Sequence, residues 1–378
     1  MMAKRGRSAN FEILRVIAML MIVFLHYYLF AFAGVDRKVH WNAMSLVNYI
    51  LFQNTLLLCH SGVGLFVLIS GYFMSEKQWG TNWKGLFNIW FRTFFYGTLF
   101  CLLLFRITPA PFSFRIFLQY ALPLTGNQYW FITDYIALLL ISPFLALLSQ
   151  SLSRWQFTTL MVILPLFGLT VIMNFPYGNA VGAGNGYTLL FFIILYLVGA
   201  YIRKYDISLP GRWRVAAPFA AMLFCFLWIS FREYFSTGLL EYKNPRYNDL
   251  SAFVTVAIFL AFKDWKAPDN VLTRSLVALA PYAFGIYLIH EQPHVRYHLW
   301  FWVRNVFHPD LHSAASFPIC IGICLAIFAL CAMVDCMVGK LMEWVGLEAF
   351  CQKAGTQIDR FSNRVVAFLS RGGDTKGK

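Results

Sequence analysis

Residues 11–26 read FEILRVIAMLMIVFLH, an apolar run that carries Glu12 and Arg15 near its start and ends on His26. At about 100° per residue, the eleven steps from Arg15 to His26 make three turns plus about 20°, so both side chains leave the same face of a helix. Their backbones lie about 16 Å apart along that face. The pattern predicts a membrane helix that holds a cation near one membrane surface and an ionisable imidazole deep inside.

The rest of the chain has the composition of a polytopic membrane protein. It is 59% hydrophobic and 13% charged, with a mean hydropathy of +0.61, whereas soluble domains are about 25% charged. Its apolar runs last about 17–25 residues and lack the in–out alternation of a transmembrane β-barrel. We therefore predict an all-α membrane bundle of about ten transmembrane helices. The expected spans are residues 11–33, 58–75, 85–105, 130–149, 156–174, 187–202, 215–231, 248–262, 275–291 and 315–338.

The charge distribution predicts how the chain crosses the bilayer. A net charge of +14 on so apolar a chain fits anionic lipid headgroups, and the sequence has no nucleic-acid-reading module. Most of the 31 Lys and Arg residues fall on the side of the N-terminus, which predicts that both termini are cytoplasmic in a plasma (inner) membrane. We expect residues 1–340 to form one transmembrane domain and residues 341–378 a cytoplasmic, basic amphipathic tail.

Ionisable residues inside the spans are the first candidates for function. Such a residue costs about 2.5–3.5 kcal/mol at mid-helix on insertion scales. Placing Arg15 in the membrane costs less than placing His26 there, because the long side chain of Arg15 reaches back to the interface. His26 lies about four and a half turns into its span and needs a partner or a polar cavity. The structural alternative is a core histidine that is satisfied by its neighbours.

Further cations occur early in the third predicted span. Lys84 and Arg92 are eight residues apart and point within about 80° of each other on a helix. Together with Arg15 they would form an inner-surface cation cluster suited to phosphate groups, such as those of a nucleotide. Ordinary positive-inside anchors explain them equally well.

Two segments at the opposite surface carry polar and aromatic side chains. Trp130, Asp134 and Tyr135 suit stacking and hydrogen bonding to a sugar, or an aromatic belt at the headgroups. In residues 284–298, FGIYLIHEQPHVRYH, three histidines recur at i, i+4 and i+8, a spacing compatible with zinc. Because Pro293 interrupts this run at an interface, a polar rim without metal is favoured over zinc.

The span HSGVGLFVLISGYFM, residues 60–74, is interrupted by glycines and serines. Small residues let helices approach closely, and they also let backbone line a cavity. The eight cysteines fall mostly in apolar segments and are expected to be small core residues.

Taken together, these residues resemble the acyltransferase family 3 of membrane-bound cell-envelope O-acyltransferases. The family's first helix carries an arginine, ten residues and a histidine, which Arg15 and His26 match. Its Phe-Phe-x-x-Ser-Gly-Tyr pattern is matched in residues 66–72 except that Val67 replaces the second aromatic residue. The segments YWFI…SPF at residues 129–144 and FGIYLIH at residues 284–290 follow in the family's order, and the similarity spans about residues 10–340.

The resemblance implies transfer of an acyl group, usually acetyl from cytoplasmic acetyl-CoA, across the bilayer to a hydroxyl of an exported glycan or lipid-linked sugar. It implies that His26 is catalytic and acts together with Arg15, and an imidazole suits the general-base task. The donor would be held by Arg15, Lys84 and Arg92, and the acceptor by the aromatic and polar set Trp130, Asp134, Tyr135, Tyr287 and His290. We expect no metal cofactor. Whether His26 acts as a base or carries the acyl group stays open, and a secondary transporter or flippase is the alternative function.

Overall fold

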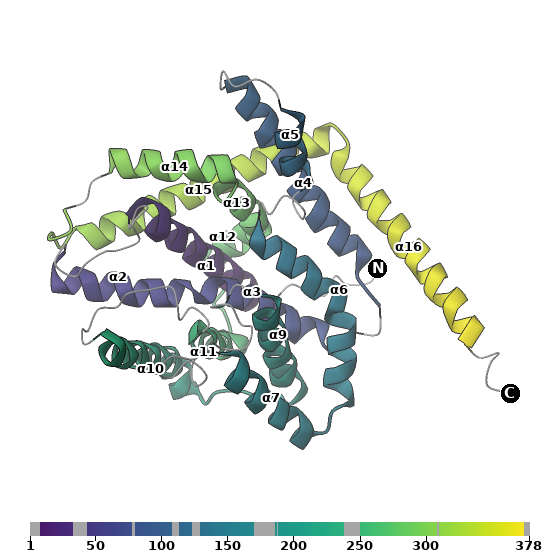
Figure 1. The fold of residues 1–378 in the computed structure, drawn as a ribbon, viewed down its shortest axis with the longest axis horizontal. Helices are drawn as coiled ribbons and strands as arrows, with labels where there is room; N and C mark the ends of the chain where they lie inside the picture. The colour runs from purple at the N-terminus through teal and green to yellow at the C-terminus, as the bar shows by residue number, and fades with distance from the viewer. Residues whose placement is uncertain are drawn as a thin grey trace.

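A computed structural model describes residues 8–32, 44–77, 80–107, 113–122, 129–169, 186, 188–237, 250–307 and 310–373. In these ranges the regular structure is entirely helical (Figure 1). The elements are α1 (Ala9–His26), the π-helical turn η1 (Tyr27–Phe32), α2 (Leu46–Cys59), α3 (Ser61–Met74), α4 (Trp83–Ile107), α5 (Phe114–Ala121), α6 (Trp130–Ser151), α7 (Arg154–Gly168), α9 (Leu189–Lys204), α10 (Gly211–Thr237), α11 (Ser251–Lys263), α12 (Val271–Leu279), the 3₁₀ turn η5 (Ala280–Tyr282), α13 (Ala283–His290), α14 (Pro293–Val306), α15 (Ser316–Trp344) and α16 (Leu347–Gly373).

Helix α1 runs through the middle of the bundle (Figure 1). It packs against α2, α3, α11, α12, α13 and α15, and it contributes to both large apolar clusters. Its first half joins a cluster with α3, α9 and α11, and its second half joins one with α13, α14 and α15. Side chains on α1 are therefore shared between the two halves of the core.

Seven helical segments of the described chain are long and apolar enough to cross a membrane, which confirms the prediction of a polytopic all-α protein. They are Ala9–Ala31, Leu46–Met74, Trp83–Leu103, Trp130–Ser151, Gly211–Phe231, Val271–His290 and Ser316–Trp344. Helices α7, α9 and α11 also lie on predicted spans, but they are 15, 16 and 13 residues long. The number of ten crossings and the side on which each terminus lies stay predictions.

The second predicted span begins too late in the sequence. Helix α2 precedes α3, and the two form one apolar segment with a turn at His60. The polar residues Asn48 and Gln53 interrupt the apolar run, so the sequence pattern does not indicate a membrane helix here, although both side chains are buried. The amide of Asn48 donates to the carbonyl oxygens of Leu311 and Ser313, which removes the cost of burying it.

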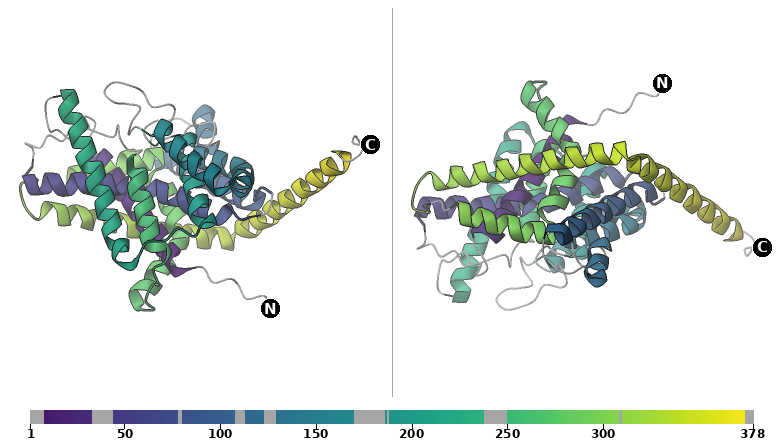
Figure 2. Two further views of the ribbon diagram at one scale, coloured as in Figure 1. Left: turned by 90° about the horizontal axis from the view of Figure 1, so that it is seen from below. Right: turned by 90° about the horizontal axis from the view of Figure 1, so that it is seen from above.

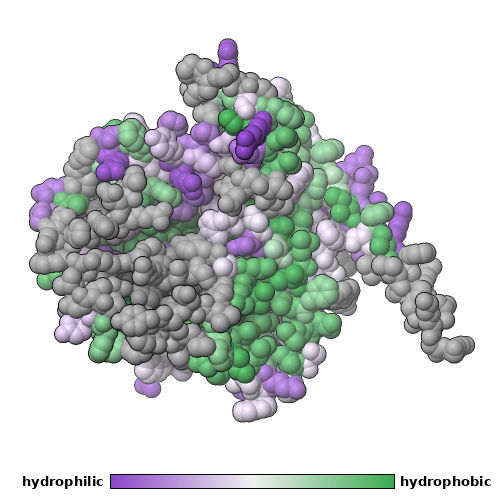
Figure 3. Space-filling view, in the orientation of Figure 1, coloured by the Kyte–Doolittle hydropathy of each residue, from purple (hydrophilic) through white to green (hydrophobic). Residues whose placement is uncertain are grey.

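The outer surface of the bundle has the apolar character that lipid requires. Figure 3 shows a continuous hydrophobic area over the region where α6 and α7 lie in Figure 1. Exposed residues there include Leu140, Phe144, Leu147 and Ile163. An exposed apolar area of this extent is costly in water and suits a lipid environment. The protein is therefore a multi-pass membrane protein.

Glycines hold α3 and α9 in close contact. A Cβ added at Gly71 would overlap the carbonyl group of Tyr196, and one at Gly199 would overlap the carbonyl oxygen of Leu68. The small residues predicted to favour close helix approach in residues 60–74 do so at Gly71.

We expect Gly71→Ala to lower the unfolding free energy by about 1–3 kcal/mol, because the backbones of two helices must move apart. The measurement is the thermal unfolding midpoint of the purified protein. Gly322→Ala in α15 is the matched control, since an added Cβ there meets no atom of the described chain within 4 Å. Equal midpoints for the two variants would contradict the prediction.

The predicted domain boundary at residue 340 falls within a helix, and the boundary itself stays a prediction. Residue 340 lies inside α15, which continues to Trp344, and α16 then leaves at a bend and packs against α4 (Figures 1 and 2). The rings of Phe91 and Phe350 are 6.2 Å apart, and the thiol of Cys351 donates to the side-chain oxygen of Asn88. The far end of α16 extends away from the bundle (Figure 2).

Candidate active site

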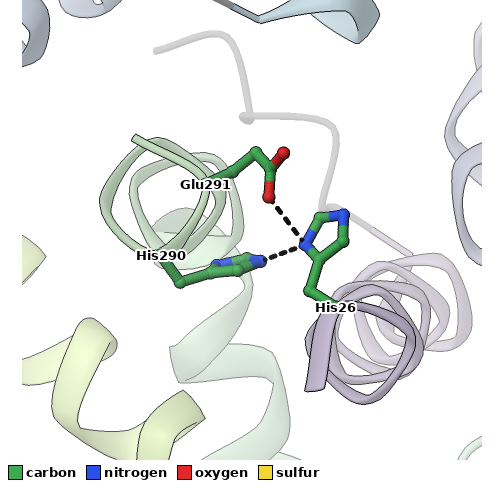
Figure 4. A group of neighbouring side chains, drawn as sticks. All are labelled: His26, His290 and Glu291. Carbon is green, nitrogen blue, oxygen red and sulfur yellow. Dashed lines mark hydrogen bonds and ion pairs between the residues drawn. The ribbon is translucent and has the colours of Figure 1, made fainter. Parts of the chain in front are cut away.

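His26 ends α1, at the point where the α-helix changes into the π-helical turn η1. Such local changes of helical geometry frequently mark functional sites, because they alter the direction of a side chain within a rigid element. His26 is buried and points towards the end of α13, where it meets His290 and Glu291 (Figure 4). Three side chains from two distant parts of the sequence therefore meet inside the membrane domain.

Hydrogen bonds assign the protons of the two histidines. His290 Nδ1 lies 2.6 Å from the carbonyl oxygen of Ile286, which only accepts, so Nδ1 carries the proton and Nε2 carries a lone pair. His26 Nδ1, 2.9 Å from that Nε2 and 3.1 Å from the carboxylate of Glu291, must then be the donor. The second nitrogen of His26, Nε2, is left with a free lone pair. This is the tautomer that a general base needs.

Glu291 joins His26 to a cation. Its side chain is 4% exposed, and its second oxygen accepts a hydrogen bond from Arg296. The guanidinium of Arg296 in turn lies 5.0 Å from the ring centre of Phe30 in η1. Arg296 balances the buried carboxylate, and the carboxylate in turn is placed to stabilise any positive charge that would form on His26.

An apolar cavity of about 310 Å³ lies next to this cluster. Helix α1 contributes Met19 and Ile22 to its wall, and α13 contributes Phe284 and Tyr287. The other lining residues are Phe66, Asn88, Ile89, Arg92, Phe131 and Tyr135. The hydroxyl of Tyr287 is buried and has no hydrogen-bond partner among the described residues, so it is available to a bound molecule.

A larger pocket of about 810 Å³ lies at the beginning of α1. Three cations line it: Arg15 from α1, Lys77 after α3, and Arg203 near the end of α9. Glu12 and Glu76 line it too, and they pair with Arg15 and Arg203 respectively. We call it the cationic pocket. Its positive charges would favour an anionic ligand, which would compete with these two carboxylates.

The two pockets and the histidine cluster follow one another along the same two elements. On α1, Arg15 lines the cationic pocket, Met19 and Ile22 line the apolar cavity, and His26 ends the helix. These positions are i, i+4, i+7 and i+11, which is one face of a helix. The neighbouring chain follows the same order, from Ala280 and Pro281 through Phe284 and Tyr287 to His290. One helical face therefore leads from the cations of the cationic pocket to a buried imidazole.

The structure does not bring Lys84 and Arg92 to Arg15. Arg92 lines the apolar cavity and is paired with the buried carboxylate of Asp335 at 2.8 Å, so its charge is already balanced. Lys84 packs against Gly355 of α16, and its backbone N–H donates to Asp359. The predicted cluster of three cations is therefore separated into three places, because its members come from different helices.

The predicted acceptor residues are divided as well. Tyr135 lines the apolar cavity, where its hydroxyl is 2.8 Å from that of Ser70. Trp130 packs instead against Phe131 and Phe192, and Asp134 is partly buried on the same helix. His290 is the member of this set that contacts His26, and Tyr287 lies one helical turn before it, with the two ring centres 6.1 Å apart.

The histidine spacing predicted to be compatible with zinc does not form one helical face. Helix α13 ends at His290 and α14 begins at Pro293, so His294 and His298 belong to another helix. The ring of His294 lies against that of Tyr120 in a tilted arrangement, with ring centres 5.1 Å apart, and burial and the charge of His298 lower the pKa of His294. Pro293 in the sequence indicated this break between the two helices.

Sequence reasoning missed Glu291, Arg296, Lys77 and Arg203. A signal for Glu291 was present, since an acidic residue directly after His290 is unusual beside an apolar run. Lys77 and Arg203 lie at the ends of apolar segments, where positive-inside anchors are expected. The local sequence does not distinguish a cation that binds a ligand from one that only anchors a helix.

Comparison with known proteins gives one match. The acyltransferase domain profile of acyltransferase family 3 matches residues 8–337, which include α1 to α14 and most of α15. The chain gave no significant match among curated proteins or solved structures. A match over so much of the chain establishes its family: the protein belongs to acyltransferase family 3 and is a membrane acyltransferase.

Proposed function

We propose that the protein transfers an acyl group, acetyl in the first instance, from cytoplasmic acyl-CoA to a hydroxyl of an envelope glycan or lipid-linked sugar. The observation that carries this proposal is the order of residues along one face of α1, where Arg15 lines the cationic pocket, Met19 and Ile22 line the apolar cavity, and His26 follows. It matches a donor with charged phosphates at one end, a long flexible arm and a reactive thioester at the other.

The cationic pocket is the proposed site of the donor's phosphates. Arg15, Lys77 and Arg203 replace the set Arg15, Lys84 and Arg92 expected from the sequence. The distance of about 16 Å from Arg15 to His26 along the helix suits the extended pantetheine arm. Charge-assisted hydrogen bonds from arginine are the strongest contacts that a protein offers to phosphate.

Arg203→Gln is expected to raise the KM for acyl-CoA about tenfold, equivalent to about 1.4 kcal/mol, with little change in kcat. Lys77→Gln should act in the same direction, and raising the salt concentration should weaken donor binding in the parent more than in either variant. Steady-state kinetics with purified protein measures both. Arg274→Gln is the control, because Arg274 is exposed and pairs with Asp269 away from the pocket. A lowered kcat with unchanged KM would contradict the assignment.

At the other end of the path, His26 acts as the base. The acceptor hydroxyl gives its proton to His26 Nε2 as its oxygen attacks the thioester carbonyl. The C–S bond then breaks, the acyl group stays on the acceptor oxygen, and the proton passes to the departing thiolate. Glu291 stabilises the imidazolium while it exists, and His290 fixes the orientation of its ring.

Tyr287 is the proposed hydrogen-bond donor to the thioester oxygen, which becomes negative during the attack. Its side chain lines the cavity, and its hydroxyl is buried and has no partner in the described chain. Tyr287→Phe is expected to lower kcat by about 10²–10³-fold without loss of thermal stability. In the control Tyr129→Phe, stability should fall instead, because the hydroxyl of Tyr129 bonds to the carbonyl of Leu288. A Tyr287→Phe protein that melts early would point to a structural role.

The test of the function uses the purified full chain in liposomes with acetyl-CoA and envelope glycan. We expect free thiol to be released and ester-linked acetyl groups to appear on the glycan in equal amounts. Succinyl-CoA in a parallel reaction tests the donor. A transporter or flippase would move a substrate across the liposome membrane without releasing thiol, and that result would overturn the proposal.

A further inference from the structure

The donor atoms of His26, His290 and Glu291 converge on one small volume. The distances from His26 Nδ1 are 2.9 Å to His290 Nε2 and 3.1 Å to Glu291 Oε2, and all three atoms lie within 4.8 Å of one another. A tetrahedral zinc ion with bonds of about 2.0–2.2 Å holds its ligand atoms about 3.3–3.5 Å apart. The two distances from His26 Nδ1 would have to lengthen by a few tenths of an ångström, and the His290 Nε2–Glu291 Oε2 distance, which is at most 4.8 Å, would have to reach the same value.

A second observation points to a cation at this place. Glu291 Oε2 is buried and accepts no hydrogen bond from any residue that the structure describes. Burying a carboxylate oxygen without a hydrogen bond is energetically unfavourable, and a bound cation would offset this cost. The oxygen points towards His26 Nδ1, 3.1 Å away, on the same side as the imidazole of His290 (Figure 4).

The surroundings also have the form of a metal site. The other oxygen of Glu291 is held by Arg296, and the other nitrogen of His290 donates to the carbonyl of Ile286. Metal-bound histidines and carboxylates are oriented by outer partners of these kinds. Two imidazoles and one carboxylate are ligands that zinc accepts, with the fourth position left for water.

We propose that His26, His290 and Glu291 bind a divalent cation of the zinc class, and that the cation reversibly inhibits the protein. A cation on His26 Nδ1 requires the tautomer in which the proton lies on Nε2. In that tautomer Nε2 has no lone pair to receive the proton of a hydroxyl. The inhibition rests on the proposed function, whereas binding of the cation does not.

The test uses Co²⁺ as a spectroscopic probe of the purified full chain in detergent. We expect one site per chain with the intense visible absorption of four-coordinate Co²⁺, which Zn²⁺ displaces. His290→Asn and Glu291→Gln should weaken binding at least about tenfold. The double variant His294→Asn/His298→Asn is the matched control and should keep the spectrum. Melting curves identify variants that fail to fold, in which case His290→Gln replaces His290→Asn.

Each outcome bears on a separate part of the proposal. A missing spectrum, or one that survives in folded His290→Asn and Glu291→Gln, would overturn the site. Zn²⁺ should also stop thiol release from acyl-CoA, and a chelator should restore it. Bound Zn²⁺ with undiminished turnover would overturn the inhibition. A protein that binds the cation but transfers no acyl group leaves the site standing and overturns the proposed function instead.

Discussion

Replacing His26 with alanine is expected to lower kcat for acyl transfer by about 10²–10⁴-fold, the usual contribution of general acid–base catalysis. The KM for acyl-CoA should change little, because the cations of the proposed donor site lie at the other end of α1. The measurement is steady-state thiol release and glycan acylation by purified protein, together with the O-acetyl content of the surface glycan in cells at matched membrane levels.

His298→Asn is the control for the loss of a histidine, because His298 is exposed on α14. It should retain the activity of the parent. A folded His26→Ala protein with full activity would exclude His26 both as the base and as a carrier of the acyl group. If the variant formed a stable acyl adduct elsewhere, Ser70 and the cysteines would be the next residues to replace.

Glu291→Gln is expected to reduce kcat by about 10²–10⁴-fold, although Gln has nearly the same shape. A glutamine amide facing His26 Nδ1 places an N–H donor where the parent has a carboxylate oxygen 3.1 Å away. This favours the tautomer with the proton on Nε2, which cannot act as the base. The variant also leaves Arg296 without its counter-ion and the imidazolium without stabilisation.

Kinetics separates this positioning role from simple damage to the fold. We expect the KM for the donor and the thermal midpoint to stay near the parent values, and Glu291→Asp to recover part of the lost kcat. Glu343→Gln is the control, since Glu343 is exposed on α15. Equal loss of activity in Glu291→Gln and Glu291→Asp, together with early melting of both, would argue that Glu291 is purely structural.

The sequence predicted the parts of the site that one helix determines. Helical periodicity placed Arg15 and His26 on one face of α1, and residues of that face line the cationic pocket and the apolar cavity. It also marked His26 as a residue in need of a partner, which His290 and Glu291 provide. These inferences succeed because the geometry of a helix is local.

Periodicity was not enough where contacts join distant segments. The angle between Lys84 and Arg92 on their helix does not determine where Arg15 lies. The charge of Arg92 is balanced by Asp335, which lies 243 residues away in the sequence. His26 and His290 are 264 residues apart, so their pairing depends on how α1 packs against α13. Helix α2 was missed for a similar reason, because the partners that satisfy Asn48 come from residues 311–313.

One rigid helix carries both Arg15 and His26, so the depth of the proposed base is fixed relative to the cationic pocket rather than to the opposite face of the bilayer. A thicker bilayer would leave the span from pocket to base unchanged while lengthening the route by which the acceptor approaches from the far side. Hydrophobic mismatch would then act on the two substrates unequally. Lipids with longer acyl chains should raise the KM for the glycan and leave that for acyl-CoA nearly constant.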